Sequence, residues 1–140
     1  MDDDLTGNFE YQVAVRWRDM DALGHVNHAV FLTYLEVGRD AFYIQMLGND
    51  PIYVVARLEI DFRAEVSTHE EWIQVRVEVE RLGTTSLTTR ETITTADGTV
   101  AARARVVTVR WDQAAHRSIP FSADERERLT AAMVPADWHS

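Results

Sequence analysis

A chain of 140 residues has the size of one ordinary domain, and a composition that is 46% hydrophobic and 26% charged is typical of a globular protein. The sequence contains no cysteine, which excludes disulfides, thiolate metal sites and a catalytic thiol. The net charge of −9 repels nucleic acids and anionic membrane surfaces, so we expect neither as a partner. An acidic amino terminus and the lack of a long apolar run favour a single cytoplasmic domain over residues 1–140.

The first predicted element is a half-buried strand over residues 9–17, where apolar and polar side chains alternate. The next is a long helix from His28 to Leu47, in which apolar residues recur at spacings of three and four. Asn27 is suited to cap its start and Gly48 to end it. At about 1.5 Å per residue, this helix is roughly 30 Å long, enough to cross a small domain.

Two strands are predicted directly after the helix. Apolar residues alternate with charged ones over residues 56–63, and again over residues 72–80. A turn follows at Leu82-Gly83-Thr84, where glycine favours a reversal of the chain. Both segments therefore have the pattern of half-buried strands.

The last part of the chain is predicted as a hairpin followed by a short helix. Residues 87–95 are rich in threonine, and the turn dipeptide Asp97-Gly98 connects them to a strand over residues 100–111. The tail from Asp124 to Met133 has the pattern of an amphipathic helix. Since most turns are short, the sequence predicts an α+β fold with an antiparallel five-stranded sheet around one long central helix.

The segment between the first strand and the helix contains the residue types that acyl chemistry needs. Two carboxylates, two histidines and an asparagine precede a helix start, where free N–H groups and the positive dipole end stabilise an oxyanion. Thioester cleavage requires a carboxylate that attacks the carbonyl or activates water, and N–H donors for the oxygen that becomes negative. Asp21 and the N–H groups near His28 supply both.

Each of these residues also has a structural interpretation. Asp21 is an ordinary turn residue near a helix start, and Asp19 fits best as a strand-end partner of Arg16 or Arg18. Asn27 is a helix cap first and a substrate contact second. The spacing of His25 and His28 suits a metal, but the neighbouring sequence offers no third ligand, so we expect no metal.

The same segment, Asp19-x-Asp21-x-x-Gly24-x-Val26 followed by an aromatic-rich helix, resembles the hydroxybenzoyl-CoA thioesterase-like branch of the hotdog superfamily. The resemblance continues through residues 31–36, 58–63 and 81–86 and covers nearly the whole chain. The sequence His25-Val26-Asn27-His28 is also similar to acyl-carrier-protein thioesterases of the same fold. Coenzyme A and an acyl carrier protein therefore both remain as the acyl carrier.

The resemblance implies a hotdog acyl-CoA thioesterase that forms a homodimer or homotetramer and uses no metal or cofactor. Its active sites would lie at the subunit interface. It places the catalytic carboxylate at Asp21, as nucleophile or general base, and the carbonyl-polarising N–H at His28, with Asn27 beside it. The substrate-binding residues that it implies are His25, Gly83, Thr84 and Ser86.

Several positions leave alternatives open. Leu23 and Glu65 depart from the family pattern, and Glu36 could act as a second carboxylate. Guanidinium groups bind phosphate bidentately, so exposed arginines are candidates for the CoA phosphates. A hotdog enoyl-CoA hydratase and a non-catalytic acyl-CoA-binding module are the alternative functions. The candidate arginines are Arg57, Arg63, Arg81, Arg103 and Arg105.

Overall fold

The computed structural model describes residues 9–48 and 53–133. Its elements, in chain order, are β1 (Phe9–Ala14), a 3-10 helix η1 (Trp17–Asp19), α1 (His28–Leu47), β2 (Tyr53–Phe62), β3 (Trp72–Leu82), β4 (Ser86–Thr95), β5 (Val100–Asp112), β6 (Arg117–Ser118) and α2 (Ala123–Ala131).

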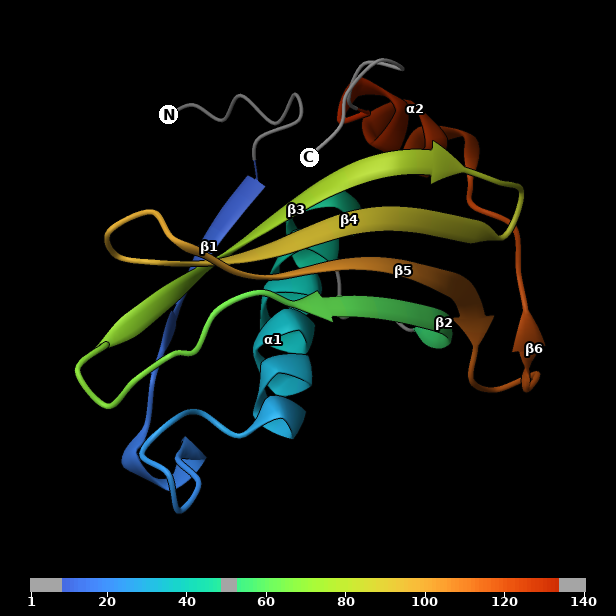
Figure 1. The fold of residues 1–140 in the computed structure, drawn as a ribbon. Coiled ribbons are helices and arrows are strands. Elements are labelled where there is room, and N and C mark those ends of the chain that lie inside the picture. The colour runs from blue at the N-terminus through green and yellow to red at the C-terminus, as the bar shows by residue number, and fades with distance from the viewer. Residues whose placement is uncertain (1–8, 49–52, 134–140) are drawn as a thin grey trace.

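The strands form one antiparallel sheet that curves around α1 (Figure 1). The strand order is β1-β3-β4-β5-β2, and the short β6 pairs with β5. The helix α1 lies in the concave side of the sheet, and α2 lies at the end where β3 and β4 meet (Figure 1). The predicted α+β arrangement is therefore confirmed, with β6 as an addition to the five expected strands.

The helix α1 begins and ends at the residues that the sequence predicts. The Asn27 side chain accepts a hydrogen bond from the backbone N–H of Ala29 at 2.8 Å, which satisfies one free donor of the first turn. At the other end, Gly48 has a φ of 89°, a left-handed conformation that glycine adopts without strain. The side of α1 that faces the sheet is buried along its length, at Phe31, Tyr34, Leu35, Gly38, Phe42, Tyr43 and Met46.

The helix α1 packs closely against β3 at Gly38. A Cβ added to Gly38 would lie 2.5 Å from Cγ1 of Val75 and 2.7 Å from its Cβ. We therefore expect Gly38→Ala to destabilise the fold by about 1–3 kcal/mol, since overpacking outweighs the roughly 1 kcal/mol that alanine gains in helix propensity. Urea unfolding measures the change. In the Val75→Ala background the same substitution should cost clearly less, and an equal cost in both backgrounds would contradict this explanation.

One difference from the predicted elements concerns β1, which ends at Ala14 and not at Trp17. The backbone N–H of Arg16 donates to the Asp19 carboxylate at 2.9 Å, and the N–H of Asp19 donates back to the Arg16 carbonyl at 2.9 Å. These local bonds favour a helical turn over continued strand pairing. The Trp17 side chain is left 89% exposed.

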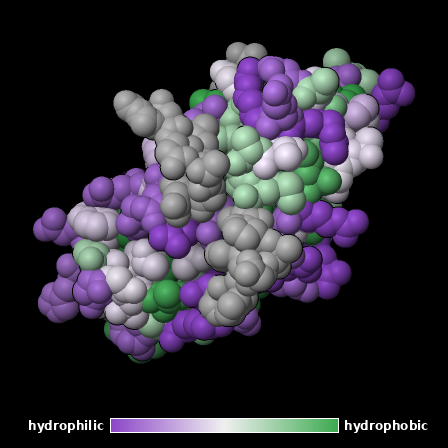
Figure 2. All heavy atoms as spheres, turned by 90° about the horizontal axis from the view of Figure 1, so that it is seen from above, coloured by the Kyte–Doolittle hydropathy of each residue, from purple (hydrophilic) through white to green (hydrophobic). Residues whose placement is uncertain are grey.

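The face seen from the side of α2 is mostly hydrophilic, with one larger patch of apolar residues and smaller apolar spots elsewhere on the same face (Figure 2). Neither α1 nor α2, the two α-helices of the described residues, has the length and apolar composition needed to cross a membrane.

Candidate active site

A cavity of about 420 Å³ lies where the η1–α1 loop, the first turn of α1 and the end of β2 meet. It brings together three residues that the sequence singles out, Asp21, His25 and His28. The apolar side chains of Phe31 and Phe62 form part of its wall. An ionisable group, a helix start and an apolar wall in one hollow are the usual features of a small-molecule site.

The Asp21 carboxylate is held by its own turn. Its Oδ1 accepts hydrogen bonds from the backbone N–H groups of Leu23 at 2.8 Å and His25 at 3.2 Å. The turn is closed by the Asp21 N–H, which donates to the His25 carbonyl at 2.7 Å, and by Gly24, whose φ is 81°. Within residues 9–48 and 53–133, no other residue donates a hydrogen bond to Oδ2 of Asp21.

The hydrogen bonds of this turn also set the charge of Asp21. Donation from Leu23, and then from His25, lowers the pKa of the Asp21 carboxyl below its ordinary value. The side chain is therefore an anion at neutral pH. An ionised carboxylate with one free oxygen can attack a carbonyl carbon or take a proton from water.

The amide of His28 is the donor that the loop leaves free. Asn27 occupies the next two amides of α1, because its side chain accepts from Ala29 and its carbonyl accepts from Val30 at 2.9 Å. No acceptor in the described part of the chain pairs with the His28 N–H. The imidazole ring of His28 stacks on Phe62 with 4.3 Å between the ring centroids. His28 thus offers its amide, while its ring packs against the cavity wall.

Asp19 anchors the loop that carries Asp21. Its buried carboxylate accepts from the Tyr34 hydroxyl at 2.7 Å and from the Arg16 guanidinium at 3.1 Å, and its carbonyl accepts from the Asn27 N–H at 2.9 Å. Burial raises the pKa of Asp19, but the hydrogen bonds from Tyr34 and Arg16 outweigh it and leave the pKa lowered. The predicted pairing of Asp19 with Arg16 is confirmed, but Asp19 lies in η1 and not at the end of β1.

The hydroxyl of Tyr34 connects this anchor to α1, so we expect Tyr34→Phe to act on both stability and turnover. Loss of one hydrogen bond to a buried carboxylate should lower the free energy of unfolding by about 1–3 kcal/mol. A displaced loop should also reduce kcat for the predicted thioester cleavage by about tenfold. The matched control is Tyr53→Phe, whose hydroxyl donates to Asp40. It should lower stability without the loss of kcat, and equal losses of kcat in both variants would refute the positioning role.

The two residues that depart from the family pattern both line the cavity. Leu23 is 78% exposed at its mouth, and Oε1 of Glu65 lies 3.2 Å from Nε2 of His25, a contact that is an ion pair when the imidazole is protonated. The loop is also tied to this segment through the Val26 N–H, which donates to the Val66 carbonyl at 2.8 Å. Leu23 and Glu65 are therefore placed to shape the entrance.

The predicted substrate-binding turn lies elsewhere in the chain. Ala14, which leads into the Asp21 loop, pairs with Trp72 at the start of β3, whereas Gly83 follows the end of β3. The eleven residues of β3 make ten steps of about 3.3 Å, which separate the two ends by roughly 33 Å. The chain does not bring Gly83, Thr84 or Ser86 together with Asp21, and their contact with substrate stays a prediction.

The turn that contains Gly83 is packed against the α2 end of the chain. The Gly83 carbonyl accepts from the Arg126 guanidinium at 2.7 Å, and the Thr84 carbonyl accepts from the Phe121 N–H at 3.1 Å. The carboxylate of Glu36 is exposed on α1 and is not among the residues that line the cavity.

The residues described by the structure contain no group of three or more His, Cys, Asp or Glu side chains placed to hold a metal ion. Phe62 and Glu65 line the cavity but are not among the site residues that the motif predicts. Phe62 belongs to a strand with the alternation of apolar and polar residues, and in the sequence only its position at the end of that strand indicates that it can line the site. That strand end and the helix start are far apart in sequence, so their meeting depends on the tertiary fold.

Known proteins resemble this chain over most of its length. The family model of the thioesterase-like superfamily matches residues 15–129. A thioesterase from Thermus thermophilus, whose structure contains coenzyme A and zinc, is 35% identical, with a TM-score of 0.75 over 86% of this chain and 95% of that one.

Two Bacillus proteins are also similar to the chain. A protein of Bacillus stearothermophilus described as a predicted thioesterase is 26% identical, with a TM-score of 0.80 over 91% of this chain and 97% of that one. The uncharacterised protein YsmA of Bacillus subtilis is 25% identical over 87% of this chain and 85% of its own length. Together with the sheet that curves around α1, these similarities confirm the predicted hotdog fold.

Proposed function

The chain belongs to the thioesterase-like superfamily, and we propose that it hydrolyses an acyl-CoA thioester to a free carboxylic acid and CoA. The observation that carries the proposal is one cavity lined by both Asp21 and His28. Within the part of the chain that the structure describes, it combines an ionised carboxylate, one oxygen of which accepts no hydrogen bond, with an unpaired amide at a helix start. Coenzyme A in the structure of the Thermus relative supports CoA as the carrier.

The chemistry follows from these two groups. The carbonyl oxygen of the thioester accepts from the His28 N–H, which stabilises the negative charge that forms when the carbonyl carbon is attacked. In one route, Oδ2 of Asp21 attacks the carbon, CoA leaves as a thiolate, and water then hydrolyses the mixed anhydride. In the other, Asp21 takes a proton from a water molecule that attacks directly. Both routes consume one water and release acid and thiol.

The two routes can be distinguished by rapid quenching of a single turnover. If Asp21 is the nucleophile, mass spectrometry of the quenched protein shows the acyl group on the peptide that contains residue 21. If Asp21 is the base, thiol release occurs with no acylated peptide at any time.

The open side of the cavity supports a second subunit as part of the site. Phe62 is 42% exposed although it forms a wall, and β2 is an edge strand of the sheet. Val54 and Val55 on the same strand are exposed. We therefore propose a homodimer or homotetramer, which light scattering on the purified protein tests. A monomer that hydrolyses acyl-CoA would contradict it.

A screen for thiol release over short, long and aromatic acyl-CoAs tests the function. Release of CoA from at least one thioester supports the proposal. Crotonyl-CoA is included because loss of its enoyl absorbance without thiol release would indicate a hydratase instead. Thermal stabilisation by acyl-CoAs with no release would indicate a binding module.

A further inference from the structure

A second cavity, of about 180 Å³, lies on the outer face of the sheet. Four arginines line it, Arg63 and Arg103 together with Arg90 and Arg105, and two carboxylates, Glu59 and Asp61, share the lining. The lining therefore carries two more positive charges than negative ones, in a chain whose net charge is −9. We refer to these six residues as the arginine cleft.

Two of the four arginines already have carboxylate partners. Arg90 and Arg105 both donate to Glu80, at 3.1 Å and 3.0 Å. Such pairing satisfies their guanidinium groups and fixes them behind the cleft. Any further anion would therefore be held mainly by the other two arginines.

Among the described residues, no carboxylate forms an ion pair with Arg63 or Arg103. The Nε of Arg103 is buried without a hydrogen-bond acceptor, and no ion pair or side-chain hydrogen bond in the described residues involves Arg63. Burial lowers the pKa of Arg103, and the nearby charge of Arg63 lowers it further, whereas Glu78 acts in the opposite direction. Two cations are thus held close enough to repel each other. An anion between them would relieve this repulsion.

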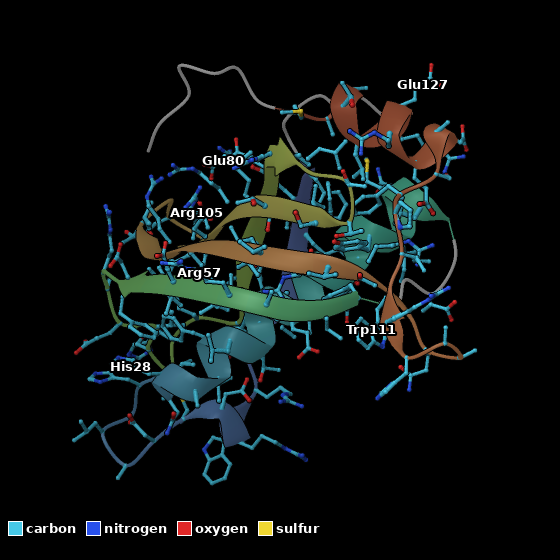
Figure 3. All side chains as sticks on the ribbon, turned by 90° about the vertical axis from the view of Figure 1, so that its right-hand side faces the viewer. His28, Arg57, Glu80, Arg105, Trp111 and Glu127 are labelled. Atoms are coloured by element: carbon cyan, nitrogen blue, oxygen red, sulfur yellow. The ribbon has the colours of Figure 1, made fainter. Side chains whose placement is uncertain are left out.

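The arginine cleft adjoins the cavity that contains Asp21. Arg63 lines both hollows, and the neighbouring Phe62 forms a wall of the first. From Phe62 to Glu59 the strand advances three residues, or roughly 10 Å at about 3.3 Å per residue. Figure 3 shows Arg57, Arg105 and Glu80 following one another across the sheet, with His28 below them on the same side of the view. Because Arg63 lines both hollows, they meet at this end of β2.

We propose that the arginine cleft binds the phosphate groups of the CoA nucleotide, with Arg63 and Arg103 as the principal ligands. The inference rests on the proposed thioesterase function. Guanidinium groups donate two parallel hydrogen bonds to phosphate oxygens, which matches the pyrophosphate and 3′-phosphate of CoA. The flexible pantetheine arm joins these phosphates to the thioester and is longer than the separation along β2. It would pass the end of β2 beside Arg63.

The test compares acyl-CoA with the same acyl group on pantetheine, which lacks the nucleotide. In Arg103→Gln and in Arg63→Gln, KM for acyl-CoA should rise about tenfold, so that the preference for acyl-CoA over acyl-pantetheine falls by a similar factor. Adenosine 3′,5′-bisphosphate should inhibit the wild type competitively and the variants more weakly. The matched control is Arg76→Gln on the same face, whose side chain pairs with Glu10 and does not line the cleft. It should keep the preference.

The outcomes distinguish a failure of the phosphate-binding proposal from a failure of the proposed thioesterase function. An unchanged preference in both cleft variants would overturn the inference while leaving thiol release intact. A change of oligomeric state in sedimentation with an unchanged preference would overturn it as well, and would assign the face to a second copy of the chain. If the wild type releases no thiol from any thioester, calorimetry with adenosine 3′,5′-bisphosphate still tests the cleft, since Arg103→Gln should weaken that binding about tenfold.

Discussion

Replacing Asp21 by asparagine is expected to reduce thiol release from acyl-CoA by about 10²–10⁴-fold while the fold remains intact. The asparagine oxygen can still accept from the N–H groups of Leu23 and His25, which hold the turn together. What the variant loses is the negative charge, and with it the ability to attack a carbonyl or to take a proton from water. Steady-state thiol release with a purified Asp21→Asn protein measures the effect.

A second aspartate in a similar setting provides the control for this variant. Asp97 also lies in an exposed turn and accepts hydrogen bonds from Thr95 and Thr99, but it is not among the residues that line the cavity. Asp97→Asn should retain full turnover. Retention of turnover in Asp21→Asn, or an equal loss in Asp97→Asn, would contradict the role of Asp21.

The charge of Asp21 also predicts how the rate depends on pH. Its pKa is lowered by the N–H groups of Leu23 and His25, so the active, ionised form exists above that lowered value. As the pH falls, we expect the rate to be lost at a pH below the ordinary pKa of an aspartate, because the ionised carboxylate persists to that point. An acidic limb of kcat/KM near neutral pH would indicate another essential base.

The second large effect is expected at the buried ion pair between α1 and β4. Arg39 is 2% exposed and Glu91 is 0% exposed, and the guanidinium donates to both carboxylate oxygens, at 2.8 Å and 2.9 Å. The Thr89 hydroxyl also donates to Glu91, at 2.7 Å. Glu91→Leu leaves the Arg39 charge buried and unpaired. We expect it to lower the free energy of unfolding by about 3–5 kcal/mol, as measured by urea unfolding.

Removing both charges shows whether the stability lost in Glu91→Leu comes from the unpaired, buried charge of Arg39. The double variant Arg39→Met with Glu91→Leu replaces the pair by apolar groups, and should recover most of the stability lost in Glu91→Leu alone. Arg57→Gln, which breaks the exposed pair with Glu59, should change stability by less than about 1 kcal/mol. If the double variant is less stable than Glu91→Leu, the unpaired charge is not the cause of the loss.

The sequence predicts most accurately what depends on neighbouring residues. The bounds of α1 are correct at both ends because capping is local, through Asn27 at the start and the left-handed Gly48 at the end. The location of the candidate site follows in the same way, since Asp21 and His28 are joined by one short loop and meet in one cavity. Interactions between neighbouring residues thus determine the bounds of α1 and the location of the centre of the site.

The features that the sequence does not predict depend on contacts between distant segments. The pairing of Arg39 with Glu91 joins residues 52 positions apart, and no local pattern relates them. The approach of Phe62 and Glu65 to the Asp21 loop likewise requires the sheet to fold around α1. The early end of β1 has a local cause, because the bonds between Arg16 and Asp19 close a turn. Strand periodicity alone does not reveal it.

The most direct test of the account is a crystal structure of Asp21→Asn with a bound acyl-CoA that the variant cleaves slowly. We predict that the thioester oxygen accepts from the His28 N–H and that its carbonyl carbon lies beside the side chain of residue 21. A thioester bound elsewhere on the protein, or one whose oxygen is turned away from the start of α1, would contradict the proposed chemistry.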